Sequence, residues 1–434
     1  MCGIVGYVGD RDCADVLVDA LSKLEYRGYD SAGIAVFEKG TIKVEKCKGR
    51  LANLVDKMAV DGKPQGHCGI GHTRWATHGE PSDINSHPHG NKRVSIVHNG
   101  IIENYKQIKD FLVEEGYSFV SETDTETVAK LLDYYYVDDP VDTIIKVLSE
   151  IKGSYALGIM FRDYPDTVFA VRKESPLIVG VGENENFLAS DVPAIIKYTR
   201  DYYLLEANEI AVVKKDSVQI YDMHKEPVHK EINTADWDVD AAEKGGYEHF
   251  MLKEIHEQPA AVRDTVSPRI VNGMPDLSQD GIDMQKLKEY RQIFIVGCGT
   301  AMHAGMVGKY VIEKLARKPV VVDIASEFRY RDPLITKEDL LIVISQSGET
   351  ADTLAVLRLA KEVGAATMAV VNVVGSSIAR EADMVVYTHA GPEISVASTK
   401  AYMVQISVMY LLAFELAYAN GTIDKEKCME LTRQ

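Results

Sequence analysis

The second half of the sequence repeats one pattern, in which a short apolar run is followed by a polar loop and then by a helix. The apolar runs lie at residues 293–296, 320–323, 340–344, 368–371 and 384–387, and a long closing helix is expected at 397–419. Strands that alternate with helices are typical of a doubly wound parallel sheet. Ligands of such sheets bind beyond the carboxyl ends of the strands, so the polar loops that end these runs are candidate binding sites.

One of these loops, SQSGET at residues 345–350, has the composition of a phosphate site. Ser345, Ser347 and Thr350 bring three hydroxyls to the start of a helix, where free N–H groups and the helix dipole favour an anion. Capping of the helix by Ser or Thr explains one of these hydroxyls but not all three together with Gln346. The other loop, GCGTA at residues 297–301, lacks the third glycine of a dinucleotide fingerprint, which disfavours a nucleotide site.

The first seven residues, MCGIVGY, place a cysteine directly after the initiator Met. Removal of Met1 is usual before a small residue, and it would leave Cys2 with both a thiol and a free α-amine. The amine titrates near pH 7.7–8.0 and a free thiol near about 8.5, so the amine can accept the thiol proton. The alternative interpretation is an ordinary buried cysteine on a first strand.

Three later segments of the first half are unusually polar, and each lies at the end of an expected strand or at the start of an expected helix. Residues 71–79 read GHTRWATHG, residues 98–100 read HNG and residues 121–126 read SETDTE. Asn99 offers a side-chain amide and Gly100 an unhindered backbone N–H, the two kinds of donor that an oxyanion hole uses. Asp124 can either belong to the first turn of the following helix or receive the ammonium group of a substrate. A solvated loop is the alternative for residues 71–79.

Composition excludes several function classes. A chain of 434 residues with 46% hydrophobic residues predicts two domains. The formal net charge of −17 argues against nucleic-acid and anionic-membrane partners. We count no apolar run long enough for a membrane span and find no signal segment, which predicts a cytoplasmic protein. The six cysteines are scattered without metal-ligand spacing, so neither a disulfide framework nor a metal site is expected.

Five segments in one order resemble the class II glutamine amidotransferases. They are residues 1–7, RGYDSAG at 27–33, residues 71–79, HNGIIEN at 98–104 and residues 121–126. The resemblance covers residues 2–222 and implies an N-terminal-nucleophile fold, an αββα sandwich with two packed sheets between helix layers. It implies no cofactor.

The resemblance also implies roles for individual residues. Cys2 would attack the side-chain amide of L-glutamine with its own α-amine as base, while Asn99 and the N–H of Gly100 hold the oxyanion. Arg74 would bind the α-carboxylate of glutamine, because a guanidinium suits a planar anion, and Asp124 would bind its α-ammonium group. Further residues implied to line the glutamine pocket are Trp75, Thr77, His78 and His87.

Residues 285–425 resemble the sugar isomerase (SIS) module, with residues 345–353, SQSGETADT, as the most specific run. Residues 223–284 would form a linker with helices, one of which is expected to end at Pro259. Together with EISVASTKA at residues 393–401, both halves resemble the glutamine:fructose-6-phosphate aminotransferases (isomerizing). The sugar-phosphate residues that this implies are Thr300, Ser345, Gln346, Ser347, Thr350, Val396 and Ser398. Ala301 stands where many relatives have Ser.

The resemblance implies that ammonia from glutamine converts D-fructose 6-phosphate to D-glucosamine 6-phosphate, and we expect a homodimer. The family normally has a second SIS module and a tail with a Schiff-base lysine, so we expect this chain to be a truncated form competent only for glutamine hydrolysis. Lys400, the internal candidate for that lysine, is expected to be solvated or at an interface. A sugar-phosphate sensor with an inactive first half is the alternative function. Loops typical of amidophosphoribosyltransferase and asparagine synthetase do not occur in the sequence.

Overall fold

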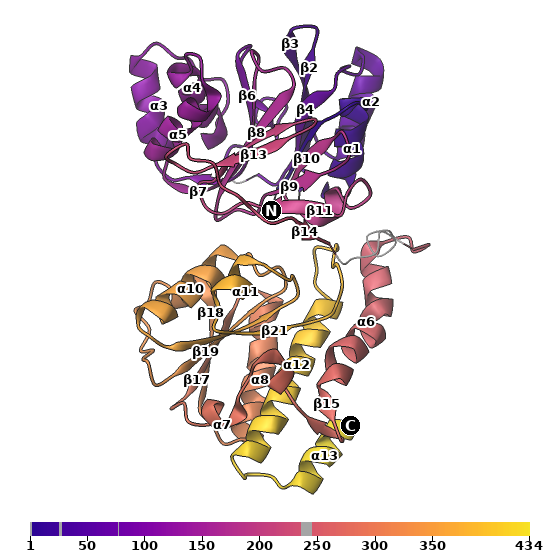
Figure 1. The fold of residues 1–434 in the computed structure, drawn as a ribbon, viewed down its shortest axis with the longest axis vertical. Coiled ribbons are helices and arrows are strands. Elements are labelled where there is room, and N and C mark those ends of the chain that lie inside the picture. The colour runs from indigo at the N-terminus through magenta and orange to yellow at the C-terminus, as the bar shows by residue number, and fades with distance from the viewer. Residues whose placement is uncertain (1, 26–27, 77, 236–244) are drawn as a thin grey trace. The chain divides into compact units, whose positions relative to one another are not determined.

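The computed structural model describes residues 2–25, 28–76, 78–235 and 245–434. The chain divides into two compact units, residues 1–239 and residues 240–434 (Figure 1). The finer ranges expected from the sequence, 2–222, 223–284 and 285–425, stay predictions.

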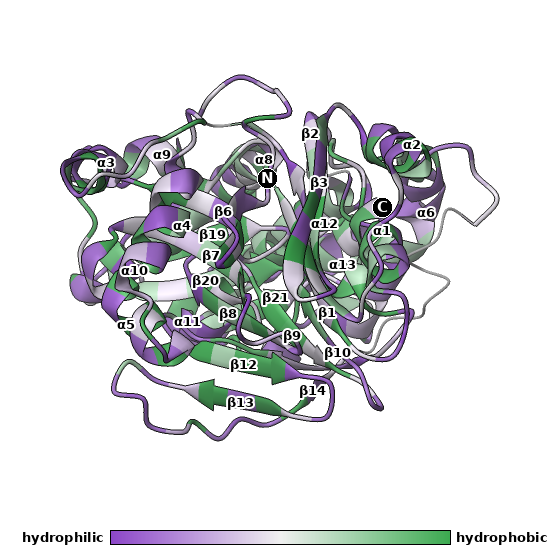
Figure 2. Ribbon diagram, turned by 90° about the horizontal axis from the view of Figure 1, so that it is seen from above, coloured by the Kyte–Doolittle hydropathy of each residue, from purple (hydrophilic) through white to green (hydrophobic). Residues whose placement is uncertain are grey.

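The first unit contains two antiparallel sheets. The strand order of the larger sheet is β14-β11-β9-β10-β1-β4-β2-β3, and β1 lies in its middle between β10 and β4. Its strands are β1 (Gly3–Val8), β2 (Ser31–Glu38), β3 (Thr41–Lys48), β4 (Cys68–Arg74), β9 (Ile178–Val181), β10 (Asn186–Ala189), β11 (Asp201–Leu204) and β14 (Asn233–Thr234). The order in the smaller sheet is β13-β12-β8-β7-β6-β5. Its strands are β5 (His89–Gly90), β6 (Val94–Ile102), β7 (Gly153–Phe161), β8 (Thr167–Lys173), β12 (Ile210–Lys214) and β13 (Val218–Tyr221). Figure 2 shows β12 mostly in the hydrophobic colour.

Side chains on β1 alternate between two hydrophobic cores, as the period of a strand requires. Ile4 and Val8 belong to the core shared with residues of the smaller sheet. Val5 and Tyr7 belong to a core with α1 (Cys13–Ser22) and α2 (Leu51–Asp61). A third core packs the smaller sheet against three helices. These are α3 (Tyr105–Glu114), α4 (Asp124–Tyr135) and α5 (Pro140–Glu150). The unit is thus the predicted αββα sandwich, in which both sheets contribute to one central core.

The second unit is built on one parallel sheet of order β18-β17-β19-β20-β21, which confirms the predicted doubly wound fold. Its strands are β17 (Ile293–Gly297), β18 (Val320–Ile324), β19 (Leu340–Ser345), β20 (Ala366–Val371) and β21 (Met384–Tyr387). Helices cover both faces of the sheet. The helices are α8 (Thr300–Leu315), α9 (Ala325–Phe328), α10 (Ala351–Glu362), α11 (Ser377–Glu381) and α12 (Lys400–Ala419).

The remaining elements of the second unit lie outside this repeat. They are α6 (Phe250–Val266), β15 (Ile270–Val271), β16 (Met274–Pro275), α7 (Met284–Leu287) and α13 (Lys425–Arg433), together with short 3-10 turns at Ser267–Arg269 and Ser278–Asp280. The predicted end of a helix at Pro259 is wrong, because α6 continues through Pro259 to Val266. Pro259 is exposed, so water can reach the carbonyl that its missing N–H leaves free. Buried side chains on both sides of Pro259, including Glu254, Ala261 and Thr265, hold the helix in place.

Helix α12 is long and apolar enough to cross a membrane, with a mean hydropathy of 1.4. From the sequence, we expected no such run. However, 56% of this stretch is buried inside the protein, where it packs with α8 and contributes to the core under the parallel sheet. A core helix has the same composition, so its burial accounts for its hydropathy.

Candidate active site

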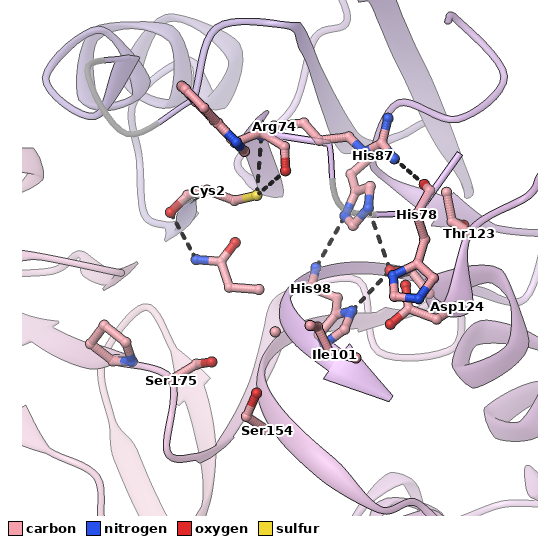
Figure 3. Close-up of a pocket in the computed structure, with 15 residues that line it drawn as sticks. Cys2, Arg74, His78, His87, His98, Ile101, Thr123, Asp124, Ser154 and Ser175 are labelled. Carbon is pink, nitrogen blue, oxygen red and sulfur yellow. Dashed lines mark hydrogen bonds between the residues drawn. The ribbon is translucent and has the colours of Figure 1, made fainter. Parts of the chain in front are cut away.

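Cys2 directly precedes the central strand β1, and the chain on either side of β1 fixes its position. The N–H of Ile4 donates to Ser190 Oγ at 2.8 Å, and the N–H of Ser190 donates back to the carbonyl of Ile4. The Cys2 thiol accepts the N–H of Trp75 at 3.2 Å and lies 3.4 Å from the carbonyl oxygen of Trp75 (Figure 3). The sulfur is therefore held at the end of β1 beside the segment that follows β4.

A cavity of about 290 Å³ opens next to this sulfur and brings together most of the residues predicted for the glutamine pocket (Figure 3). Its lining includes predicted residues from β4, β6 and α4, from the loop between β4 and β5, and from the position just before β1, namely Cys2, Arg74, Trp75, His78, His87, Asn99, Gly100 and Asp124. Thr77, also predicted for this pocket, lies outside the described residues. The arrangement follows from the topology, because β4 and β6 end at the same side of the two packed sheets.

Asn99 connects the cavity to the nucleophile. Its Nδ2 donates to the carbonyl oxygen of Cys2 at 3.1 Å and to Ser190 Oγ at 3.0 Å. Gly100 has a φ of +131°, and a Cβ there would lie 2.1 Å from the carbonyl oxygen of Ser154, so no larger residue fits.

Arg74 is 3% exposed, and its guanidinium is only partly satisfied by the protein. Nη2 donates to the carbonyls of His78 and Gly79, whereas Nη1 is buried without a hydrogen-bond partner among the described residues. A buried donor without a partner is costly. On the other side, Asp124 at the start of α4 accepts the N–H of Ile102 through Oδ2 at 2.9 Å. The cavity therefore has one cationic and one anionic group, which suits a zwitterion.

Four buried histidines in and beside the cavity are held neutral by their surroundings. Burial lowers the pKa of His72 to about 3, and burial also lowers the pKa values of His87, His89 and His98. These rings can donate or accept hydrogen bonds at neutral pH but carry no charge. His78 contributes its carbonyl to Arg74 and packs edge-on against Tyr105.

The environment of the Cys2 sulfur disfavours the thiolate. Burial raises the pKa of Cys2, and this effect exceeds the lowering by the Trp75 N–H and by the charge of Arg74. The resting group is therefore a thiol at neutral pH, and attack by its sulfur requires a base.

In the second unit, both predicted phosphate loops lie at the carboxyl edge of the parallel sheet. β17 and β19 are adjacent, with Gly297 opposite Ile344, and α8 begins at Thr300 while α10 begins just after Thr350. Ser345 Oγ accepts the N–H of Gly348 at 3.1 Å. This bond turns the SQSGET loop back on itself just before the N-terminus of α10, with Gly348 at a φ of +64°.

The loop at residues 393–399 is held by two carboxylates, the buried Glu254 and the half-buried Glu393. Glu254 of α6 accepts the N–H groups of Ile394 and Ser395, at 2.6 and 3.0 Å. Glu393 accepts the hydroxyl of Ser398 at 2.9 Å and two N–H groups at the start of α12. Val396 is 68% exposed at the tip. The predicted sugar contacts of Val396 and Ser398 stay predictions.

The expectation that Lys400 is solvated or at an interface is wrong for this unit. Lys400 is 3% exposed, and its Nζ donates to Glu257 of α6 at 2.6 Å. Lys253, also buried, lies 3.5 Å from the same carboxylate. The buried lysine thus joins α12 to α6 through an ion pair with the partly exposed Glu257, which a pattern of small residues before a helix does not reveal.

Sequence reasoning missed three residues that support the cavity. His72 contacts Asn99, Ser190 contacts both Asn99 and Ile4, and the carboxylate of Asp30 accepts the N–H of Ala76 in the loop after β4. Asp30 lies in the segment RGYDSAG and His72 in GHTRWATHG. His72 is a polar residue within a buried strand, and this is the signal that could have identified it.

Domain models match one segment in each of the two units. The glutamine amidotransferase domain model matches residues 72–197, and the SIS domain model matches residues 286–414. The solved C-terminal domain of glucosamine-fructose-6-phosphate aminotransferase from Francisella tularensis is 41% identical, with a TM-score of 0.43 over 44% of this chain and 54% of that chain. Glutamine phosphoribosylpyrophosphate amidotransferase from B. subtilis is 16% identical, with a TM-score of 0.48 over 93% of this chain and 92% of that chain.

Curated relatives cover almost the whole chain. Glutamine–fructose-6-phosphate aminotransferase [isomerizing] of Clostridium tetani is 57% identical over 438 residues, which is 100% of this chain and 72% of the relative. The enzyme of the same name from Thermus thermophilus is 47% identical over 100% of this chain and 72% of its own length. The chain therefore belongs to the glutamine–fructose-6-phosphate aminotransferase (isomerizing) family.

Proposed function

We propose that the cavity of the first unit binds L-glutamine and that Cys2 hydrolyses its side-chain amide to glutamate and ammonia. The observation that carries this proposal is the lining of one cavity by a thiol, an amide donor, a carboxylate and a guanidinium whose Nη1 has no hydrogen-bond partner among the described residues. Arg74 Nη1 is suited to the α-carboxylate and Asp124 to the α-ammonium group. Binding both ends of the amino acid leaves the side-chain amide to reach the sulfur.

The first step forms a bond between Cys2 Sγ and the amide carbon of glutamine. The thiol proton passes to the α-amine of Cys2, which requires that Met1 has been removed. The carbonyl oxygen becomes an oxyanion, and Asn99 Nδ2 stabilises it together with the N–H of Gly100. Both hydrogens of Nδ2 are used in the resting protein, so the oxyanion would replace the carbonyl of Cys2 as one acceptor.

Breakdown of this intermediate breaks the carbon–nitrogen bond. The proton held by the α-amine passes to the leaving nitrogen, which departs as ammonia and leaves a thioester on Cys2. Water then attacks the thioester, and glutamate is released as the thiol is restored. Atoms and charges balance without a cofactor.

We further propose that ammonia is used to convert D-fructose 6-phosphate to D-glucosamine 6-phosphate, the reaction that the names of the relatives describe. Thr300 and the loop of Ser345–Thr350 would bind the phosphate, which is supported by two helix N-termini at one edge of the sheet. Val396 and Ser398 would contact the sugar.

We propose that the protein is a cytoplasmic homodimer. We propose no nucleic-acid or membrane partner, in line with the net charge of −17.

The test is glutamine hydrolysis by the 434-residue chain and by Cys2→Ala, together with the binding of D-fructose 6-phosphate to both, measured by calorimetry. We expect the wild type to release glutamate, and we expect Cys2→Ala to release none while binding the sugar phosphate unchanged. Glutamate release by Cys2→Ala would overturn the assignment of the nucleophile. A wild-type chain that binds the sugar phosphate but never hydrolyses glutamine would instead favour the sugar-phosphate sensor.

A further inference from the structure

His72 lies on β4 at the interface between the two sheets of the first unit and is fully buried. On its own sheet it is opposite Ile4 of β1 and Gly33 of β2. Its ring reaches β6 of the other sheet, where Nε2 is 2.9 Å from Asn99 Oδ1 and 3.1 Å from the carbonyl oxygen of His98. One ring nitrogen thus contacts both the amide that faces Cys2 and the backbone that carries it.

The tautomer of His72 follows from these contacts. The carbonyl oxygen of His98 can only accept a hydrogen bond, so Nε2 must carry the proton. The other ring nitrogen, Nδ1, is buried and has no partner among the described residues. An unprotonated Nδ1 is the less costly state there, because a buried N–H without an acceptor would be left unsatisfied. Burial also holds the pKa of the ring at about 3, so the ring is neutral.

A protonated Nε2 then fixes which end of the Asn99 amide faces it. The amide atom nearest to Nε2 must be an acceptor, which is Oδ1, and this directs Nδ2 the other way. The partners of Nδ2 agree, since the carbonyl of Cys2 is an acceptor and Ser190 Oγ can accept. Without a donor at the position of Nε2, the two orientations of the amide would differ much less in energy.

We propose that His72 is a positioning residue that orients the Asn99 amide so that its N–H₂ group faces Cys2. The inference rests on the proposed glutamine hydrolysis, in which Asn99 stabilises the oxyanion. His72 does not itself line the cavity, but it contacts three residues that do: the Asn99 side chain, the carbonyl of His98 and the ring of His87. Of these contacts, only the one to Asn99 bears on the donor that faces Cys2.

Two substitutions at His72 distinguish loss of the hydrogen-bond donor from loss of the imidazole ring. Glutamine can place its amide nitrogen near the position of Nε2, whereas asparagine reaches only the position of Nδ1, which has no partner here. We expect His72→Asn to lower kcat for glutamine hydrolysis about tenfold, equivalent to about 1.4 kcal/mol, with KM unchanged. His72→Gln should recover most of the lost turnover. His67→Asn, on an exposed histidine just before β4, is the matched control and should match the wild type.

Alkylation of Cys2 by iodoacetamide distinguishes positioning from damage to the fold. This displacement develops no oxyanion, so its rate should be the same in the wild type, His72→Asn and His72→Gln.

The substitutions at His72 are also combined with Asn99→Ala, because the effects of two residues that act through one interaction are not additive. We expect His72→Asn to have no further effect in the Asn99→Ala background.

Three results would overturn the proposal: unchanged kcat in His72→Asn, equal losses in His72→Asn and His72→Gln, or a full additional loss in the Asn99→Ala background. If His72→Asn does not fold, the apolar variant His72→Leu replaces it as the donor-free protein. Failure of the proposed function is separate, because it would appear as glutamate release by Cys2→Ala.

Discussion

Asn99 Nδ2 lies 3.1 Å from the carbonyl oxygen of Cys2, so the proposed oxyanion donor of one sheet directly contacts the nucleophilic residue of the other. In Asn99→Ala, this donor is lost while Gly100 is retained. We expect kcat for glutamine hydrolysis to fall by about 10²–10³, as loss of one oxyanion donor typically does. Initial rates of glutamate release at saturating glutamine measure the effect. Turnover within threefold of the wild type would contradict the assigned oxyanion hole.

The partly satisfied guanidinium of Arg74 predicts an effect on substrate binding. Arg74→Lys keeps the charge but loses the planar fork and the contacts to the carbonyls of His78 and Gly79. We expect KM for glutamine to rise by about 10- to 100-fold, the range for a charged hydrogen bond worth about 1.5–3 kcal/mol. Steady-state kinetics measure it, with Arg162→Lys on the surface as control. A change confined to kcat would argue against carboxylate binding by Arg74.

The pKa of Cys2, which burial raises, predicts how its reactivity depends on pH. A raised pKa means that the thiolate fraction is small at pH 7 and still increases tenfold per pH unit near pH 8. The rate of alkylation by iodoacetamide should therefore keep rising beyond pH 9, where the rate for a free thiol of pKa about 8.5 levels off. Peptide mass analysis identifies alkylated Cys2. A plateau below pH 8 would show that the local charges outweigh burial.

In the loop after β19, removal of the Ser347 hydroxyl is expected to lower the affinity for a phosphate. Ser347 Oγ accepts the N–H of Glu349 at 3.2 Å and donates to no other group in the described part of the chain, so its own proton is available to a ligand. Ser347→Ala should weaken D-fructose 6-phosphate about tenfold, since a hydrogen bond to a charged group is worth about 1.5–3 kcal/mol. Calorimetric titration gives Kd, with Ser149→Ala in the other unit as control. Equal affinities would remove Ser347 from the phosphate site.

Asp339, which is fully buried, predicts a pH-dependent contribution to the stability of the second unit. Burial alone would raise its pKa, but the Arg291 guanidinium at 2.8 Å and two donors from Thr336 outweigh burial and hold the pKa below its usual value. The stabilisation is therefore present above the unfolded pKa of about 3.9 and is lost as pH falls through the lower folded value.

Asp339→Asn should destabilise the unit by about 1–3 kcal/mol at pH 7. The difference from the wild type in thermal midpoint should shrink as pH falls below about 4. A difference that stays constant from pH 7 to pH 3 would contradict a charged Asp339 in the folded protein.

Much of this fold could be predicted because local and tertiary preferences agree. The three inner strands β17, β19 and β20 are apolar runs buried on both faces, and the edge strands β18 and β21 are apolar runs that are partly buried. Each run is therefore marked in the sequence without reference to the other strands. At α6 the local preference of the sequence and the tertiary packing disagree. Pro259 locally favours the end of a helix, but the buried face that includes Glu254 and Thr265 continues past it, and tertiary packing decides.

The candidate site was predictable where side chains carry recognisable chemistry at strand ends, as with Cys2, Arg74 and Asn99. His72 and Lys400 were not, because their importance arises from partners 27 and 143 residues away, Asn99 and Glu257. A sequence shows which groups can donate or accept. Only the packing of β4 against β6, or of α12 against α6, shows which groups meet.

The central place of β1 also limits how this protein can be handled in the laboratory. Both edges of β1 are paired, so Cys2 cannot move away from the cavity to make room for added residues. A fusion partner joined to its amine would convert the proposed base to an amide and would extend from the position next to the sulfur. Affinity tags for activity measurements are therefore better placed elsewhere, or cleaved so that no residue precedes Cys2.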